Sequence, residues 1–236
     1  VSVDWFKIEQ DNIAGSVDQF ILDQNFNGAD PSLTARNKPT DPNAPFASNV
    51  VYDPNTTTYF SLYAPTFNLS KRVVEGLDFK VRYDIPTDNI GLFTLGLDMT
   101  HYYRFEQQNL PGDAWENRLG QFVDPSQGFG LGSLPRWKGN VNAFWNFSDL
   151  ELGAIVYWIS SYSDDPNVAE REVDDWVSLD LQASYNLPRD VRLTVGVQNV
   201  TDEAPPLVVG AFADNYDRDT HSLLGRFVYG QVSVKF

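Results

Sequence analysis

Residues suited to acid–base or nucleophilic catalysis are scarce in this sequence of 236 residues. There is no cysteine, and the only histidines are His101 and His221. Neither histidine has a serine or a carboxylate at a spacing that indicates a catalytic dyad, and nucleophilic catalysis needs such a partner. We therefore expect a protein that is not an enzyme. The lack of cysteine also excludes disulfide bonds and thiolate metal sites.

Acidic side chains gather in two segments that have the composition of loops. Carboxylate oxygens are preferred ligands of Ca²⁺, so each segment is a candidate metal site. The twelve-residue pattern of a calcium loop is missing, and solvated loops are commonly charged, so an ordinary acidic surface is the alternative. Apart from this calcium we expect no cofactor. The candidate metal ligands are Asp164 and Asp165 in the first segment and Asp214 and Asp217 in the second.

Aromatic side chains in the predicted loops are candidates for binding a ligand. Aromatic faces bind the CH surfaces of sugars and the rings of siderophores, although they also pack loops against one another. Binding residues concentrate on loops carried by a rigid scaffold, so we expect some of this set to touch a ligand. The candidates are Tyr52, Tyr59, Trp115, Phe122, Tyr162, Phe212 and Tyr216.

The elements that must position these residues are strands, because apolar and polar residues alternate with a period of two. Leu77, Phe79 and Val81 fall on one face of a predicted strand, while Asp78 and Lys80 fall on the other. The same pattern predicts eight strands, near residues 1–10, 77–85, 93–99, 137–147, 152–158, 177–185, 191–197 and 228–236.

The connections between these strands alternate between short and long. Outer-membrane β-barrels have short periplasmic turns and longer extracellular loops, whereas a soluble sandwich has no reason to keep every long loop at one end. The sequence therefore predicts an antiparallel transmembrane β-barrel, with a soluble, lectin-like β-sandwich as the alternative. The short connections are 86–89, 148–149 and 188–190, and the long ones are 12–58, 109–133, 164–172 and 201–221.

Composition agrees with a barrel whose strands present one face to lipid and one to a wet lumen. Charges of both signs lie on the polar face, where a dry core would not tolerate them. The longest apolar run, near residues 152–159, is far shorter than the ~18 residues of a membrane helix. The net charge of −15 argues against a nucleic-acid partner, because such binding uses clustered Lys and Arg.

Three segments resemble the TonB-dependent receptors of bacterial outer membranes. They are Val3-Asp4-Trp5-Phe6-Lys7-Ile8, the run from Asn68-Leu69 to Val74-Glu75-Gly76-Leu77-Asp78, and Asn199-Val200-Thr201-Asp202-Glu203-Ala204-Pro205-Pro206. The terminal Phe236 is similar to the last aromatic residue of the family, its barrel-assembly signal, although Gln231 stands where a glycine is usual.

The resemblance implies that this chain is the C-terminal part of a barrel of about 22 strands with a plugged lumen. The plug domain and the segment that binds the TonB complex would precede Val1, so we expect a fragment. The sequence starts inside a predicted strand and lacks the regions of a signal peptide. We expect its strands to form a curved open sheet. The implied partners are outer-membrane lipid and lipopolysaccharide, the TonB complex, the barrel-assembly machinery and a small-molecule nutrient.

The function implied by the resemblance is import of a scarce nutrient across the outer membrane. The acidic loops favour a neutral or polar solute, such as an oligosaccharide, over an anionic ligand. A ferric siderophore or cobalamin is the alternative ligand. A passive porin-type channel is an alternative function.

Overall fold

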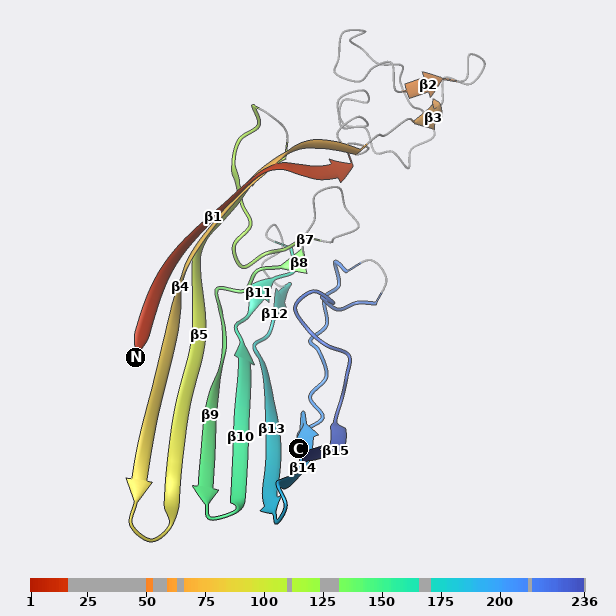
Figure 1. Ribbon diagram of the computed structural model, residues 1–236. Helices are drawn as coiled ribbons and strands as arrows, with labels where there is room; N and C mark the ends of the chain where they lie inside the picture. Colours follow the sequence, from red (N-terminus) through yellow and green to blue (C-terminus); the bar gives the residue numbers. More distant parts are fainter. Residues whose placement is uncertain are drawn as a thin grey trace.

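The computed structural model is a tall, curved sheet of antiparallel strands with its long connections gathered at one end (Figure 1). It describes residues 1–16, 50–52, 59–62, 66–109, 112–123, 132–165, 171–211 and 214–235. No helix long and apolar enough to cross a membrane occurs among these residues. The strands are β1 (Ser2–Ser16), β2 (Val50–Tyr52), β3 (Tyr59–Leu62), β4 (Thr66–Thr87), β5 (Gly91–Gln108), β6 (Glu116–Asn117), β7 (Phe122–Val123), β8 (Gly132–Ser133), β9 (Trp137–Phe147), β10 (Leu150–Ile159), β11 (Tyr162–Ser163), β12 (Glu172–Val173), β13 (Trp176–Leu187), β14 (Val191–Gln198) and β15 (Phe227–Val234).

Eight long strands form the sheet, in the order β1-β4-β5-β9-β10-β13-β14-β15. Each pairs antiparallel with its neighbour along the chain, so the predicted strands and their order are confirmed. Among the described residues, β1 and β15 pair with one strand each and not with one another. The sheet is therefore open and curved, as predicted.

Tight turns join the strands at the end opposite the long connections. The three-residue connection after β13 contains Arg189 and Asp190, whose φ values of 69° and 55° let the chain reverse within a short turn. Ser148, after β9, also has a positive φ of 52°. These turns keep the hairpins short, and they confirm the predicted alternation of short and long connections.

One face of the sheet is apolar across its whole width. Cross-strand pairing brings apolar side chains of seven neighbouring strands into a single row, because successive residues of a strand alternate between faces. The row is Tyr83, Leu95, Ala143, Ala154, Leu181, Val197 and Val228. These residues remain substantially exposed, with Leu181 42% and Val228 68% exposed, as expected of side chains that face lipid.

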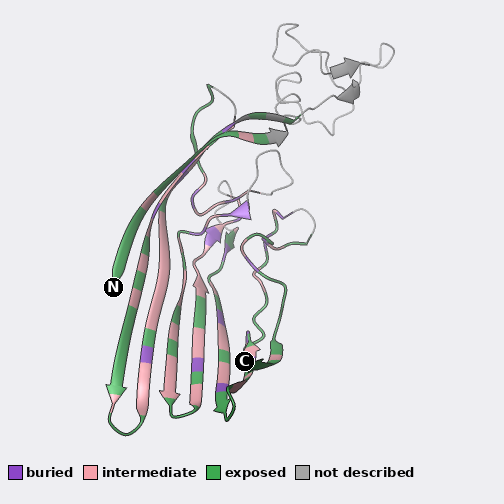
Figure 2. Cartoon of the chain, viewed as in Figure 1, coloured by how far each residue is buried: buried purple, intermediate pink, exposed green. Residues whose placement is uncertain are grey.

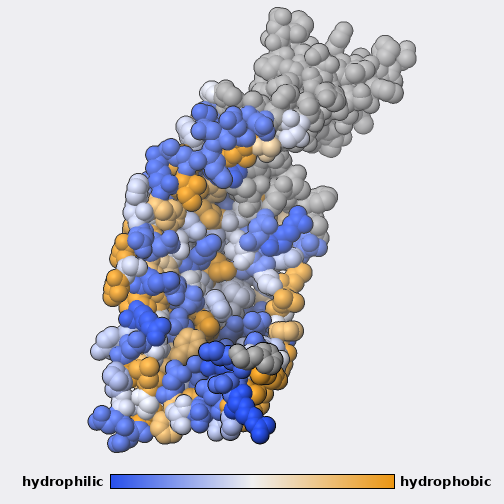
Figure 3. All heavy atoms as spheres, viewed as in Figure 1, coloured by the Kyte–Doolittle hydropathy of each residue, from blue (hydrophilic) through white to orange (hydrophobic). Residues whose placement is uncertain are grey.

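The opposite face carries the charges. Lys80 Nζ lies 3.1 Å from Asp98 Oδ1, and Arg192 Nη2 lies 2.6 Å from Glu151 Oε1. Figure 3 shows hydrophilic side chains over the middle of the visible face and hydrophobic ones along its left and right margins. This charged face is the lumen side of the sheet.

The outer boundary of the apolar band is visible on β4, where the outward-facing residue changes from Leu77 to Glu75. Glu75 Oε1 accepts a hydrogen bond of 2.7 Å from Arg104 Nη1, and Arg104 Nη2 lies 2.7 Å from Glu106 Oε2. Next to these ion pairs, on the side of the apolar band, Trp5 Nε1 donates a hydrogen bond to the Tyr103 hydroxyl. Indole and phenol groups favour such an interface between lipid and water.

The height of the band fits a membrane. β9 spans the band with 11 residues, and at about 3.3 Å per residue and a tilt of about 40° it rises about 25 Å, which is the height of the apolar belt of outer-membrane barrels. His101 lies at its outer edge, with its ring centroid 4.0 Å from that of Trp137. His101 is thus part of the aromatic girdle.

The motif at the exit of β14 ties the last two strands together. Asn199 has a φ of 48° and is buried. Its side chain accepts a hydrogen bond from Glu203 N at 2.9 Å and donates one to Glu203 O at 2.9 Å. Asp202 Oδ1 accepts from Arg226 N at 2.7 Å, directly before β15. The motif therefore fixes where the terminal strand starts.

Candidate functional site

The only extensive apolar core among the described residues lies in the connections at the extracellular end, since the long strands form a single layer (Figure 2). It is made of Phe122, Tyr162, Val173, Val208 and Ala211, which come from the β5–β9, β10–β13 and β14–β15 connections. The three connections thus fold together as one unit, called the loop unit below.

A buried carboxylate, Asp217, holds the β14–β15 connection to the β5–β9 connection. Asp217 is 0% exposed. Its Oδ2 accepts hydrogen bonds from Ser133 N at 2.9 Å and from Ser133 Oγ at 2.5 Å, and its Oδ1 accepts from Asp219 N at 3.0 Å. Ser133 Oγ lies 2.9 Å from Thr220 Oγ1. Both oxygens of the carboxylate therefore accept hydrogen bonds within the protein.

A second carboxylate, Asp164, joins the β10–β13 and β14–β15 connections. Its side chain is 3% exposed and lies 2.6 Å from Arg171 Nη2. Gly210 N donates to Asp164 Oδ1 at 2.9 Å, and Arg171 Nη1 lies 3.5 Å from Asp165 Oδ2. Arg171 thus offsets part of the acidity that the sequence places in this segment.

The remaining histidine, His221, is buried where the three connections meet. His221 Nε2 lies 3.2 Å from the Tyr162 hydroxyl, and the two rings stack at 6.0 Å. Burial lowers the pKa of His221, opposed by the nearby Asp217, and burial together with Asp217 raises the pKa of Tyr162. Both groups are held in their neutral forms at neutral pH. The Asp217 carboxylate accepts from Ser133, while His221 N donates to the backbone carbonyl of Asp217 at 2.9 Å, so among the described residues no hydrogen bond joins the Asp217 carboxylate to the His221 ring.

Replacing Asp217 with Asn is expected to loosen the loop unit by about 1 to 3 kcal/mol, because one buried donor loses its charged acceptor. Hydrogen exchange of the full-length protein in detergent should rise in the β5–β9 and β14–β15 connections. Asp214→Asn is the matched control, since Asp214 is an exposed carboxylate of the same connection. Equal exchange in the two variants would show that Asp217 does not hold the unit.

The predicted ligand-binding aromatics take different places in the structure. Phe122 and Tyr162 are 6% and 3% exposed in the core of the loop unit. Trp115 is 44% exposed, and Tyr216 is half-buried. Contact with a ligand stays a prediction for this set. Tyr52 and Tyr59 are register partners in β2 and β3, with side chains outside the described part, and Phe212 and the terminal Phe236 also lie outside it.

The predicted metal ligands are not brought together. Asp164 and Asp217 bind different partners within the loop unit, Asp165 lies near Arg171, and Asp214 is exposed. Across the residues that the structure describes, no group of three or more His, Asp or Glu side chains could hold a metal ion. Calcium binding stays a prediction.

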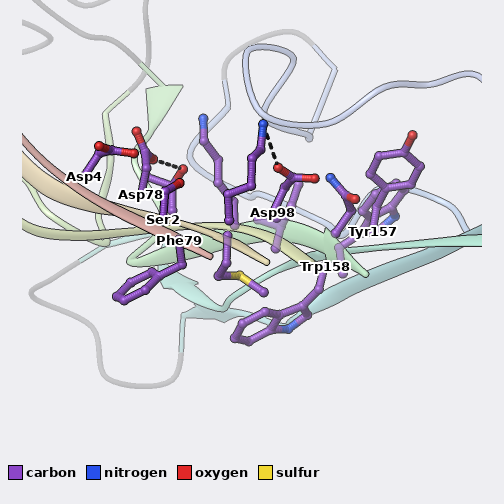
Figure 4. Close-up of a pocket in the computed structure, with 15 residues that line it drawn as sticks. Ser2, Asp4, Asp78, Phe79, Asp98, Tyr157 and Trp158 are labelled. Carbon is purple, nitrogen blue, oxygen red and sulfur yellow. Dashed lines mark hydrogen bonds and ion pairs between the residues drawn. The ribbon is translucent and has the colours of Figure 1, made fainter. Parts of the chain in front are cut away.

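The lumen wall contributes a polar groove that was not singled out from the sequence. The groove has a volume of about 580 Å³ and includes Asp4, Asp78, Asp98 and Tyr157 in its lining. Figure 4 shows these side chains on one side of the sheet, with Phe79 and Trp158 on the other. Thr100 Oγ1 donates to Asp78 Oδ1 at 2.6 Å. The alternation along each strand predicted that these charges face the lumen. Only the pairing between strands shows that they line one groove.

The fold and its two faces define a section of a membrane-spanning β-barrel of the bacterial outer-membrane type. A family model described as TonB dependent receptor-like, beta-barrel, matches residues 1–200, and the chain belongs to this family. The family consists of receptors and transporters of the Gram-negative outer membrane, not of enzymes. No curated protein sequence matches the chain.

Solved structures with the same fold include the ferric enterobactin receptor of Pseudomonas aeruginosa. One mutant of that receptor matches with a TM-score of 0.57 and 18% identity, over 99% of this chain and 28% of its own. Another mutant, in complex with enterobactin, matches with a TM-score of 0.56 and 17% identity, over 98% and 28%. The chain thus spans about 28% of the length of these receptors.

Proposed function

We propose that this chain is the C-terminal wall of an outer-membrane receptor that binds a ferric siderophore and imports it with energy from the TonB complex. The observation that carries the proposal is the family match over residues 1–200, together with the fold shared with ferric enterobactin receptors. The ligand would bind at the extracellular mouth, between the loop unit and a plug domain supplied by upstream sequence. Plug displacement would then admit the ligand to the lumen.

The ligand in this proposal differs from the polar solute that the acidic loops favoured. That preference assumed that the loop carboxylates act on an incoming ligand. Two of them, Asp164 and Asp217, are buried and bound within the loop unit. Arg171 compensates the charge of Asp164 at 2.6 Å, so not every loop carboxylate would repel an anionic ligand.

The outward face supports contact with lipopolysaccharide. Glu75, Arg104 and Glu106 form an ion-paired ladder directly above the aromatic edge of the apolar band. Lys7 and Glu9 continue the ladder on β1, with Lys7 Nζ 2.5 Å from Glu9 Oε1. Such a ladder lies at the level of the outer headgroups. The TonB complex and the barrel-assembly machinery are the other partners we propose.

Deletion of the gene should abolish growth on a ferric siderophore as the sole iron source and leave growth on limiting oligosaccharide unchanged. The purified full-length receptor should bind ferric chelates and should not conduct ions as an open pore in planar bilayers. Loss of growth on a sugar with normal growth on ferric siderophores would refute the proposed ligand class. Steady conductance without ligand binding would favour a passive channel.

A further inference from the structure

The inward face of the sheet becomes apolar above the membrane level. Phe6, Ile8, Val74, Tyr102 and Phe105 lie there, on the face that carries charges lower down. They line a groove of about 690 Å³ that is bounded on its other side by Ser133 and Leu134 of the loop unit. The groove is separate from the core of the loop unit, and at its lower end it shares Asp78 and Thr100 with the polar groove of Figure 4.

A guanidinium group lies in this apolar groove without a carboxylate partner in the described part of the chain. Arg72 Nε and Nη2 donate to Gln107 Oε1 at 3.2 and 3.0 Å, and Arg72 Nη1 reaches Gln10 Oε1 at 3.5 Å. These neutral amide oxygens orient the group but do not compensate its charge. Among the described residues, three of the five N–H donors of this guanidinium have acceptors, and two have none.

On the long strands of the sheet, the other arginines are ion-paired. They are Arg82, Arg104 and Arg192, and ion pairs also hold Arg118 and Arg171 in the connections. The other described arginines without an ion pair, which are Arg136, Arg189, Arg218 and Arg226, lie outside the strands. The nearest acid on the inward face of β4 is Asp78, about 20 Å along the strand from Arg72. Asp78 lies at the lower end of the groove and accepts a hydrogen bond from Thr100.

A second cation without a carboxylate partner lies near the lower end of the groove. Lys138 Nζ is 5.5 Å from the centroid of the Tyr102 ring, and it has no ion pair among the described residues. At the upper end, the guanidinium of Arg72 lies 5.9 Å from the centroid of the Phe105 ring. Phe6 packs edge-on against Tyr102 at 5.9 Å. Two cations thus flank a surface of aromatic rings.

We propose that Arg72 and Lys138, on either side of Tyr102, form a subsite for one anionic aromatic arm of an iron chelate, such as a catecholate. A guanidinium binds a pair of adjacent anionic oxygens with two parallel hydrogen bonds. The ring of the arm would pack against Tyr102 and Phe6, where apolar surface is available. This subsite deepens the proposed function and rests on it.

The test compares Arg72→Gln with Arg82→Gln in the full-length receptor. Both arginines lie on the inward face of β4, but Arg82 is ion-paired with Asp84 near the periplasmic end. Titration with a ferric tris-catecholate should show that Arg72→Gln raises Kd about 10- to 100-fold, the effect of losing hydrogen bonds to a charged group. Arg82→Gln should change Kd less than twofold. Arg72→Lys should give an intermediate loss, because it keeps the charge without the paired donors.

Binding of a neutral ferric trihydroxamate should be unaffected by Arg72→Gln, since no anionic arm is present. Heat-modifiable migration of each variant verifies that the barrel is folded, and Arg72→Lys provides the measurement if Arg72→Gln does not fold. An unchanged Kd for the ferric tris-catecholate would overturn the subsite while leaving the siderophore function intact.

If the wild-type receptor binds no ferric chelate, the proposed function fails. The subsite is then tested by measuring the Kd of an iron-free catechol carboxylate, and an equal Kd for wild type and Arg72→Gln would overturn it.

Discussion

Val195→Arg is expected to destabilise the folded barrel by about 2 to 4 kcal/mol, while the neighbouring Thr194→Arg costs far less. Val195 is 61% exposed on the outward face and pairs with Ala183 and Gly230 at mid-strand. An arginine there would face hydrocarbon. Thr194 lies on the lumen face, with its hydroxyl 2.8 Å from that of Ser184, so an arginine there would face water.

Folding titrations of the full-length receptor into lipid vesicles measure both free energies. Leu179→Arg and Gln182→Arg form a second pair on β13, with the same assignment of faces. The pair on β13 should repeat the difference seen on β14. Similar penalties on both faces would show that the outward face is not in contact with lipid.

The eight long strands could be predicted because most of them alternate cleanly within the membrane. The alternation used for the prediction covers only the lower parts of β4 and β5, and the structure gives the reason. A register shift between Glu75 and Gly76 adds a residue to β5 at the outer edge of the membrane. Above this level the apolar residues face inward and the charged residues face outward, which is the reverse of the arrangement below. Such a strand does not show one continuous alternation of apolar and polar residues.

β10 was the least regular predicted strand, because Ile155, Tyr157 and Ile159 are apolar on the polar face. The structure confirms that this face is the lumen side, and Tyr157 and Ile159 line the polar groove there. Trp176 lines the same groove and is the register partner of Ile159. Apolar residues are tolerated on a lumen face where aromatic neighbours cover them.

The loop unit could not be predicted, because its contacts join residues that are far apart in the sequence. Asp217 and Ser133 are 84 positions apart, and Asp164 and Gly210 are 46 apart. The clusters of acidic residues correctly drew attention to these positions. The sequence could not distinguish a metal ligand from a carboxylate that accepts backbone hydrogen bonds, because both need the same oxygens. Arg72 was missed because the sequence does not show that, among the described residues, only amide side chains accept its hydrogen bonds.

Residues 1–236 expressed alone are expected to aggregate and to form no heat-modifiable barrel. The free edges of β1 and β15 present backbone N–H and C=O groups that no described strand pairs. In lipid, each unsatisfied group costs several kcal/mol, so an open sheet cannot be stable there. Closing the eight strands on themselves is disfavoured as well, since an eight-stranded barrel has room only for packed side chains. This sheet instead places ion pairs such as Lys80 with Asp98 on its inner face.

Coexpression with the upstream part of the same receptor should restore a folded barrel, because β1 and β15 would then gain partners. Mobility on gels with and without heating, after refolding into detergent, separates the two outcomes. The full-length receptor serves as the positive control. A monomeric, heat-modifiable species from residues 1–236 alone, with hydrogen bonds between β1 and β15, would show that these edges belong to each other. The sheet would then be a small closed barrel, and its charged inner face would have to be dehydrated at a cost that the observed ion pairs alone do not offset.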